Sequence, residues 1–168
     1  MTTPIEAELR DLEPVTTIAV RLETTQDGLV QVFDRELPRV GAVMQDVGAQ
    51  MAGAPFARYH HFAPDRVDLE IGAPIAFVTA GLQPISGRPD GIIGVSSLPG
   101  GRAAVAVHRG PYDGLPQTYD GLAAWIAAEG HTAGDGPWEV YLSDPSTVAD
   151  QADLITEIVW PIASAGGR

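Results

Sequence analysis

The sequence predicts an α+β fold: tandem duplicated strand–helix–strand–strand units with antiparallel sheets, two long helices and approximate two-fold symmetry around a central cleft. Two observations support this prediction. Alternating, β-branched segments are interleaved with two segments whose apolar residues recur every three or four positions. The same order of elements then occurs twice, over residues 14–80 and 92–162. The 168 residues are expected to form one domain, residues 1–168.

The first half begins with a strand predicted at Thr16–Leu22, where β-branched residues predominate. Helical spacing of apolar residues then runs from Leu29 to Met51. Thr25 and Asp27 are both suitable N-caps, because their side-chain oxygens can accept from free backbone N–H groups. A long helix is therefore expected after the first strand.

Pro38 lies inside the helical pattern, so we expect a kink or break near residues 36–37. Gly53 and Pro55 are expected to end the helix. Two strands joined by a short turn follow, at Phe56–Phe62 and Val67–Ile75.

The second half opens with a predicted hairpin, in which residues 99–101 turn Ile92–Leu98 into Arg102–His108. A helix is expected from Leu115 to Glu129, and Gly130 stops it. The remaining strands are predicted at Trp138–Leu142 and Ile155–Ile162.

The two halves can be laid over one another. Both read strand, helix, strand, strand, and the order of elements carries more weight than short identities. The alignment places Ala19–Arg21 on Ala106–His108, Asp27–Leu29 on Asp113–Leu115, Tyr59 on Tyr141, and Glu70 on Glu157. A duplicated unit creates a groove at its axis, where ligand sites tend to form.

Composition excludes several classes of protein. The net charge is −12 and the basic residues are scattered, so direct nucleic-acid binding is not expected. There is no cysteine, which excludes disulfides, thiol nucleophiles and cysteine-ligated metals. The acidic N-terminal sequence has no signal peptide, and no apolar stretch is long enough to span a membrane. A bacterial, cytoplasmic protein is the expectation.

Glu139 and Tyr141 share one face of their predicted strand, and alternation likewise places Tyr59 and His61 together. A carboxylate among aromatic rings is poorly solvated, so it either needs a cationic partner or holds a proton. The plainer alternative is that Glu139 is solvent-exposed or paired with an arginine. Trp125 either packs against the sheet or lines the groove with these residues.

A metal site is not expected. His60 and His61 are adjacent in a predicted strand, so they point to opposite faces and cannot chelate one ion together. Glu70 and Glu157 each alternate with apolar neighbours and are expected to be solvated charges.

Several short motifs, each weak alone, stand in a fixed order across residues 14–162: His108–Tyr112, Trp125, Trp138–Pro145, Glu157 with Trp160–Ile162, and in the first half Phe56–His60 and Asp68–Ile75. Together they resemble the GyrI-like effector-binding domain, in which the same order occurs. The resemblance implies a tandem fold with a hydrophobic, aromatic small-molecule cleft and a central glutamate at Glu139. Many members are fused to a DNA-binding module. Only a short segment precedes the first expected strand here, so a stand-alone member is expected.

Two functional hypotheses follow that the sequence does not separate, beside a third in which the chain is an interaction protein with a vestigial cleft. In the first, the protein binds a lipophilic or cationic drug-like molecule, as in xenobiotic resistance, with Glu139, Tyr141, Tyr59, Trp125, His61 and Tyr112 as ligand residues. In the alternative, Glu139 is the catalytic residue of a hydrolase acting on strained, cyclopropane-bearing alkylating compounds, as in one subgroup of the family. No cofactor is expected under either hypothesis, and the oligomeric state stays open.

Overall fold

The structure is a computed structural model that describes residues 5–76, 81–144 and 147–163; Pro145, at the end of the motif Trp138–Pro145, lies outside them. The chain divides into two compact units. Unit 1 comprises Met1–Leu12 and Gly101–Arg168, and unit 2 comprises Glu13–Gly100.

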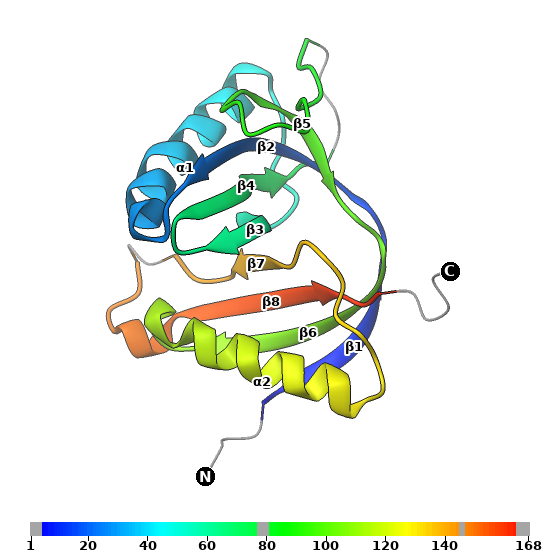
Figure 1. Cartoon of the computed structure of the whole chain (residues 1–168). Helices are drawn as coiled ribbons and strands as arrows, with labels where there is room; N and C mark the ends of the chain where they lie inside the picture. Colours follow the sequence, from blue (N-terminus) through cyan, green and yellow to red (C-terminus); the bar gives the residue numbers. More distant parts are fainter. Residues whose placement is uncertain (1–4, 77–80, 145–146, 164–168) are drawn as a thin grey trace. The chain divides into compact units, whose positions relative to one another are not determined.

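Unit 2 is a four-stranded antiparallel sheet with one helix. The chain forms β2 (Val15–Thr24), a 3-10 turn η1 (Gln26–Gly28), α1 (Leu29–Asp46), β3 (Phe56–Ala63), β4 (Arg66–Pro74) and β5 (Ile93–Leu98). The strand order is β5-β2-β4-β3. Helix α1 packs on β2 and β4 (Figure 1). Thr25 caps η1, where its side chain accepts from the backbone N–H of Gly28.

Of the kink or break expected near residues 36–37, the break is wrong, and the kink stays a prediction. Helix α1 continues through Pro38, which is exposed on its solvent side. The carbonyl that loses its backbone partner there can be hydrated, which makes a proline tolerable on the outer face. The helix also ends earlier than expected, at Asp46, because Gly48 adopts a left-handed conformation with φ 67°.

Unit 1 has the same kind of architecture. Its elements are β1 (Ala7–Leu12), β6 (Gly101–Arg109), a 3-10 turn η2 (Tyr112–Gly114), α2 (Leu115–Ala128), β7 (Trp138–Tyr141), a 3-10 turn η3 (Gln151–Asp153) and β8 (Ile155–Pro161). The four strands are antiparallel in the order β1-β6-β8-β7. Gly130 follows α2 with φ 83°, as its predicted stop signal requires.

Two expectations about strand pairing are wrong. β5 and β6 do not form a hairpin, because β5 pairs with β2 and β6 pairs with β1 and β8. The strand β1 was not expected at all. Its sequence, AELRDL, is short and charged, as is common in edge strands, and its partner β6 is distant in the chain.

With Glu70 laid on Glu157, the ladders of β2, β4 and β3 match those of β6, β8 and β7 up to the register shift after Tyr59. In unit 2, Glu70 lies between Arg21 and Arg58; in unit 1, Glu157 lies between Val107 and Val140. Tyr59 pairs with Leu69, and Tyr141 pairs with Thr156. The ladder equivalent of Arg21 is thus Val107, one residue before the His108 that the sequence alignment gave. His108 instead matches Leu22.

The core of unit 1 lies between α2 and one face of the sheet. Its buried members are Ala104, Ala106, Leu115, Leu122, Ile126 and Ile158. Since Ile158 pairs with Glu139, strand alternation directs the Glu139 side chain to this same face. The core therefore contains one acidic side chain beside its apolar residues.

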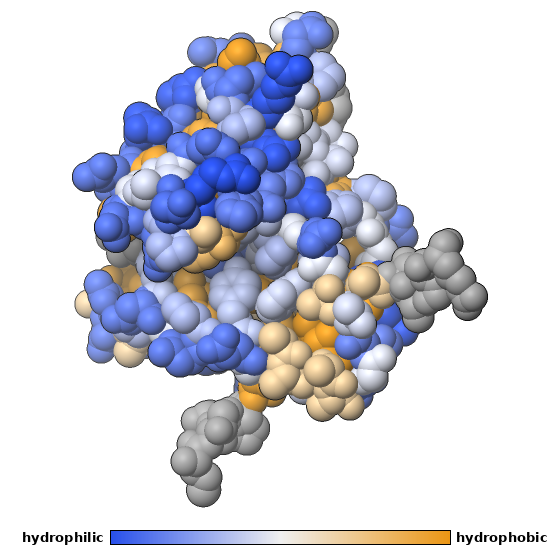
Figure 2. Space-filling model, viewed as in Figure 1, coloured by the Kyte–Doolittle hydropathy of each residue, from blue (hydrophilic) through white to orange (hydrophobic). Residues whose placement is uncertain are grey.

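The surface of the two units differs in polarity. Hydrophilic residues predominate over unit 2 in the view of Figure 2, and apolar surface is more extensive over the end of α2. Ala123, Ala124, Ala127 and Ala128 are exposed there. Among the described residues, no helix has both the length and the apolar character needed to cross a membrane.

Candidate functional site

Glu139 is the centre of the candidate site. It lies in β7, where cross-strand pairing with Ile158 turns its side chain toward the α2 side of the sheet. Only 5% of the residue is exposed. A carboxylate in such a position loses most of its hydration, and that loss must be offset by specific hydrogen bonds or by a bound charge.

Two tyrosine hydroxyl groups bind the carboxylate. Tyr119 O–H donates from α2 to Oε2 of Glu139 at 2.8 Å. Tyr141 O–H donates to Oε1 at 2.8 Å, from two residues further along β7. Each oxygen thus accepts one bond from a neutral phenol, and each retains a lone pair that can accept another.

Burial raises the pKa of Glu139 above its usual range, although the two tyrosine hydrogen bonds and a nearby His108 charge act in the opposite direction. None of the salt bridges found among the described residues involves Glu139. The two alternatives considered from sequence, exposure and an arginine partner, are therefore not what the described part of the chain shows.

Other buried carboxylates have cationic partners. In unit 2, Arg21 donates from Nε and Nη2 to the two oxygens of Asp68, each at 2.9 Å. Glu70, which is buried rather than solvated as expected, lies 2.6 Å from His60 Nε2 and accepts from Ser96 Oγ at 2.6 Å. Despite its burial, hydrogen bonds and nearby cations lower the pKa of Glu70. Glu139 therefore differs from these structural acids in both partners and pKa direction.

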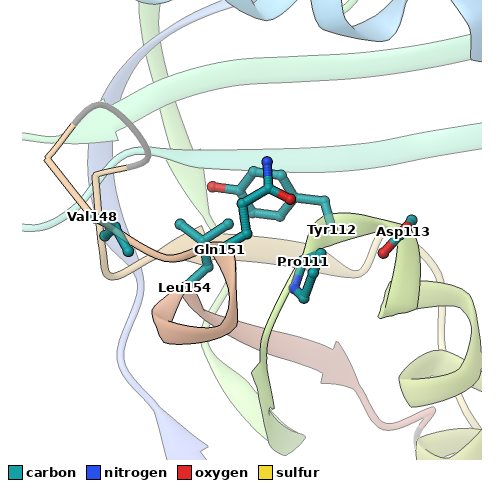
Figure 3. A pocket seen from close by; sticks show the side chains of 6 residues that line it. All are labelled: Pro111, Tyr112, Asp113, Val148, Gln151 and Leu154. Carbon is teal, nitrogen blue, oxygen red and sulfur yellow. The ribbon is translucent and has the colours of Figure 1, made fainter.

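A cavity of about 290 Å³ opens beside Tyr112, and Figure 3 shows the side chains that line it. It is lined by Pro111, Tyr112, Asp113, Val148, Gln151 and Leu154. Tyr112 connects the cavity to the site, because its ring meets Tyr141 edge-on with centroids 6.0 Å apart. Partial burial and the negative charges of Glu139 and Asp144 raise the pKa of Tyr112.

The structure brings together some, though not all, of the residues expected at the site. Glu139, Tyr141 and Tyr112 form one connected group in unit 1. Trp125 packs on the core cluster of unit 1, which matches the sheet-packing alternative, and its role toward a ligand stays a prediction. Tyr59 and His61 belong to unit 2, where Tyr59 meets Phe62 edge-on and His61 is exposed. Their participation in ligand binding also stays a prediction.

Tyr119 is the residue that sequence reasoning missed. Tyr119 lies four residues after Leu115, on the apolar face of α2, and the sequence pattern gave no reason to include it in the site. Its hydroxyl was the available signal, because a buried tyrosine normally finds a hydrogen-bond partner. Tyr119 also contacts Trp160 edge-on, with ring centroids 5.8 Å apart, which fixes its ring over β8.

His60 and His61 are not joined in a metal centre. A register shift lies between Tyr59, which pairs with Leu69, and His61, which pairs with Asp68, so the expectation that Tyr59 and His61 share a face is wrong. His60 contacts Glu70. Within residues 5–76, 81–144 and 147–163, no three His, Cys, Asp or Glu side chains are grouped so that they could hold a metal ion.

Glu139 is thus a buried acid hydrogen-bonded by two phenols, and Tyr112 connects this group to the cavity. The family comparison gives the class of protein. The chain belongs to the GyrI-like small molecule binding domain family, whose model matches residues 8–163.

Solved structures show the same fold. The chain matches the EcmrR C-terminal domain with a TM-score of 0.77 at 21% identity, over 96% of this chain and 99% of that one. In the complex of EcmrR with DNA, the TM-score is 0.79 at 22% identity, and the match covers 95% of this chain but only 58% of that chain. SAV2435 bound to tetraphenylphosphonium matches with a TM-score of 0.62 at 14% identity, over 95% of both chains.

A hydrolase from Listeria innocua is also similar, with a TM-score of 0.63 at 17% identity, over 96% of this chain and 94% of that one. At these identities the likeness concerns the fold. The chemistry of this chain must be argued from its own residues.

Proposed function

We propose that this protein binds lipophilic organic cations, with the Glu139 carboxylate as the charge partner and tyrosine rings as the walls of the site. The observation that supports this most directly is the pairing of Glu139. Its two oxygens accept from Tyr119 and Tyr141, and none of the salt bridges of the described residues includes it.

A buried acid without a cation is costly for folding, so its presence requires another explanation. A bound cation would supply the missing charge and favour the ionised form of Glu139. The same desolvation that raises the pKa of Glu139 strengthens its attraction to a cation, because water screens the pair less. Selectivity for cations over neutral molecules follows from this one group.

The aromatic residues suit a lipophilic ligand. Tyr119 and Tyr141 donate to Glu139, and the ring of Tyr112 meets that of Tyr141 edge-on. Their rings offer apolar area and negatively polarised faces, which attract organic cations. The neighbouring cavity, lined partly by Pro111, Val148 and Leu154, provides further apolar contact. In a cell, such binding would lower the free concentration of a toxic cation.

Calorimetric titration with two probes of nearly the same shape tests the proposal. Tetraphenylphosphonium is a cation and is bound by the similar protein SAV2435. Tetraphenylborate is an anion of matching size. We expect the phosphonium to bind and the borate not to bind. Equal binding of both would contradict a carboxylate-centred site.

Glu139→Gln separates charge from shape. It is expected to weaken phosphonium binding by about 2–5 kcal/mol, because the ligand loses a desolvated ion pair. A neutral planar aromatic compound should be retained. Glu157→Gln is the matched control: it makes the same chemical change on the neighbouring strand, in a side chain that is 21% exposed and contacts Arg10. We expect Glu157→Gln to bind like the wild type.

The raised pKa of Glu139 favours a second candidate, hydrolysis of a strained electrophile. Water would attack a cyclopropane carbon of the substrate, and the electron pair of the broken ring C–C bond would pass to a conjugated oxygen of the substrate. Protonated Glu139 would donate its proton to that oxygen and regain one from the attacking water, so the product is the substrate plus one water. The hydrolase from Listeria innocua shows that a protein of this fold is described as an enzyme.

Mass spectrometry distinguishes the two candidates. Incubation with a cyclopropane-bearing alkylating compound should leave it unaltered if the protein is only a binder. A product heavier by one water, lost in Glu139→Gln by about 10²–10⁴-fold in rate, would support the hydrolase.

We also propose that the two units arose by duplication of a strand–helix–strand–strand segment. The matching positions of Glu70 and Glu157 in their ladders support this, as do the 3-10 turns that precede both helices. Half-against-half alignment of family sequences should recover the same register, with Leu22 opposite His108. A different register would contradict the duplication.

A further inference from the structure

His108 lies at the end of β6, beside the Glu139 site, and is 8% exposed. Both of its ring nitrogens are bonded. Nε2 lies 2.8 Å from the carbonyl oxygen of Pro111, and Nδ1 lies 2.8 Å from the hydroxyl of Thr118. These two partners immediately precede Tyr112 and Tyr119 in the chain. The His108 ring therefore binds the backbone just before Tyr112 and the side chain just before Tyr119.

We propose that His108 is a positioning residue of the Glu139 site, which clamps the segments carrying Tyr112 and Tyr119 against the sheet. This inference rests on the proposed function for its ligand readout and has a second readout that needs no ligand. It assigns to His108 an effect on binding through the tyrosines, without contact with the ligand.

The chemistry of the ring explains why a histidine suits this position. A carbonyl oxygen only accepts, so Nε2 carries a hydrogen and donates to Pro111. In the neutral ring, Nδ1 accepts from the Thr118 hydroxyl; in the cationic ring, Nδ1 donates and the hydroxyl oxygen accepts. The clamp therefore survives protonation of His108.

The surrounding backbone makes room for the ring. A Cβ atom on Gly114 would lie 3.0 Å from Cε1 of His108, which is closer than ordinary contact. Gly114 ends the 3-10 turn η2 with a negative φ of −86°, so it is needed for space and not for its conformational freedom. In unit 2 the ladder equivalent of His108 is Leu22, and the clamp has no histidine counterpart at that position.

The clamp acts on Glu139 through hydrogen bonding. Tyr119 O–H donation favours the ionised carboxylate, and loosening Tyr119 would weaken that bond. The titratable groups around Glu139 are Tyr119 from α2, Tyr141 from β7, Tyr112 from η2 and His108 from β6. Loss of the clamp is therefore expected to move the protonation midpoint of Glu139 to higher pH.

Three variants separate the clamp from other effects of His108. Thr118→Val removes the hydroxyl with little change of shape and leaves the charge of His108 in place. Thr118→Ser keeps the hydroxyl and is the rescue. His108→Leu removes both hydrogen bonds and the imidazole charge, and introduces the residue that unit 2 carries at the matching position.

The ligand-free readout is NMR of protein labelled at the tyrosine ζ-carbons. There are four tyrosines, so Tyr→Phe variants assign every signal. The Tyr119 and Tyr141 signals should report the midpoint of Glu139 as pH is varied. We expect the midpoint to rise in Thr118→Val, to rise further in His108→Leu, and to stay at the wild-type value in Thr118→Ser.

Tetraphenylphosphonium affinity is measured on the same variants. We expect Thr118→Val to lose about three- to tenfold, as for one hydrogen bond, with Thr118→Ser near the wild type. If the Glu139 midpoint shifts in His108→Leu and not in Thr118→Val, His108 acts through charge alone and the clamp is overturned. The clamp is also overturned if the variants fold and both the Glu139 midpoint and the phosphonium affinity are unchanged. If His108→Leu fails to fold, the two Thr118 variants decide.

Failure of the proposed function gives a different result. In that case, wild-type protein would show the Glu139 midpoint in the tyrosine signals and would not bind the phosphonium. The midpoints of the variants would still test the clamp.

Discussion

Tyr119 and Glu139 join α2 to β7 by a hydrogen bond of 2.8 Å in which the phenol donates to Oε2. The bond links the middle of the helix to the strand across the core of unit 1. A buried carboxylate and its phenol donor are therefore part of the core itself. If Glu139 binds the ligand as proposed, stability and ligand binding are coupled at this position.

Glu139→Gln is expected to stabilise the ligand-free protein at neutral pH by about 1–3 kcal/mol, because a desolvated charge is removed. The folded-state pKa of Glu139 is raised, so the folded state binds more protons than the unfolded state. Wild-type stability therefore falls as pH rises from the ordinary glutamate range through the raised pKa. Urea unfolding at several pH values should show the variant's advantage growing over that interval and shrinking below it.

The Glu157→Gln variant should show no such pH-dependent gain. A Glu139→Gln protein less stable than the wild type at neutral pH would show that the carboxylate is a structural group, against the assignment made here.

Tyr119→Phe and Tyr141→Phe each remove one donor from Glu139. We expect each to raise the pKa of Glu139 and to cost about 1 kcal/mol of unfolding free energy at neutral pH. The costs should shrink when Glu139 is already replaced by Gln, since the charged acceptor is gone. A double-mutant cycle measures this, and full additivity would mean that the phenols do not act through the carboxylate.

Asp68→Asn in unit 2 should behave in the opposite way to Glu139→Gln. The Arg21 hydrogen bonds lower the pKa of Asp68, so the pair stabilises the folded state at neutral pH. That contribution is present above the unfolded-state pKa of aspartate and is lost as pH falls through the lowered pKa. We expect a loss of about 3 kcal/mol at neutral pH, declining in acid. A stabilised Asp68→Asn protein would contradict the distinction between structural and functional acids.

Two glycine replacements should have opposite effects. In β4, a Cβ on Gly72 would lie 2.1 Å from the backbone oxygen of Ile18, so Gly72→Ala must displace the neighbouring strand β2. Gly41 lies inside α1, where a Cβ meets nothing within 4 Å. Gly41→Ala should stabilise by about 0.5–1 kcal/mol through helix propensity. Thermal unfolding checks both, and a tolerated Gly72→Ala would contradict the β2–β4 packing.

Local patterns were enough to predict most elements. The spacing of Leu115, Leu122 and Ile126 identified α2, and Gly130 marked its end. The expected end of α1 at Gly53 and Pro55 was too late, because Gly48 already adopts the left-handed conformation that ends the helix. β1 was missed because a short charged strand acquires its structure from a partner that is remote in the chain.

The site was predictable only in part. Strand alternation correctly placed Glu139 and Tyr141 on one face, because both lie in a single strand. Tyr119 and His108 could not be found in this way, since their roles depend on how α2 packs over the sheet. The buried state of Glu70 likewise depends on His60 and Ser96, which come from other strands.

The pairing of β1 with β6 has a consequence for synthesis of the chain. All of unit 2 lies between these two strands, so the ribosome completes Glu13–Gly100 before β6 emerges. Unit 2 has all of its strands by then and can fold first, whereas β1 waits as an unpaired edge. The alternating charges of AELRDL, including Glu8 and Arg10, would protect this waiting segment from aggregation. Assembly of unit 1, and with it the Glu139 site, therefore has to wait until β6, β7 and β8 have been synthesised.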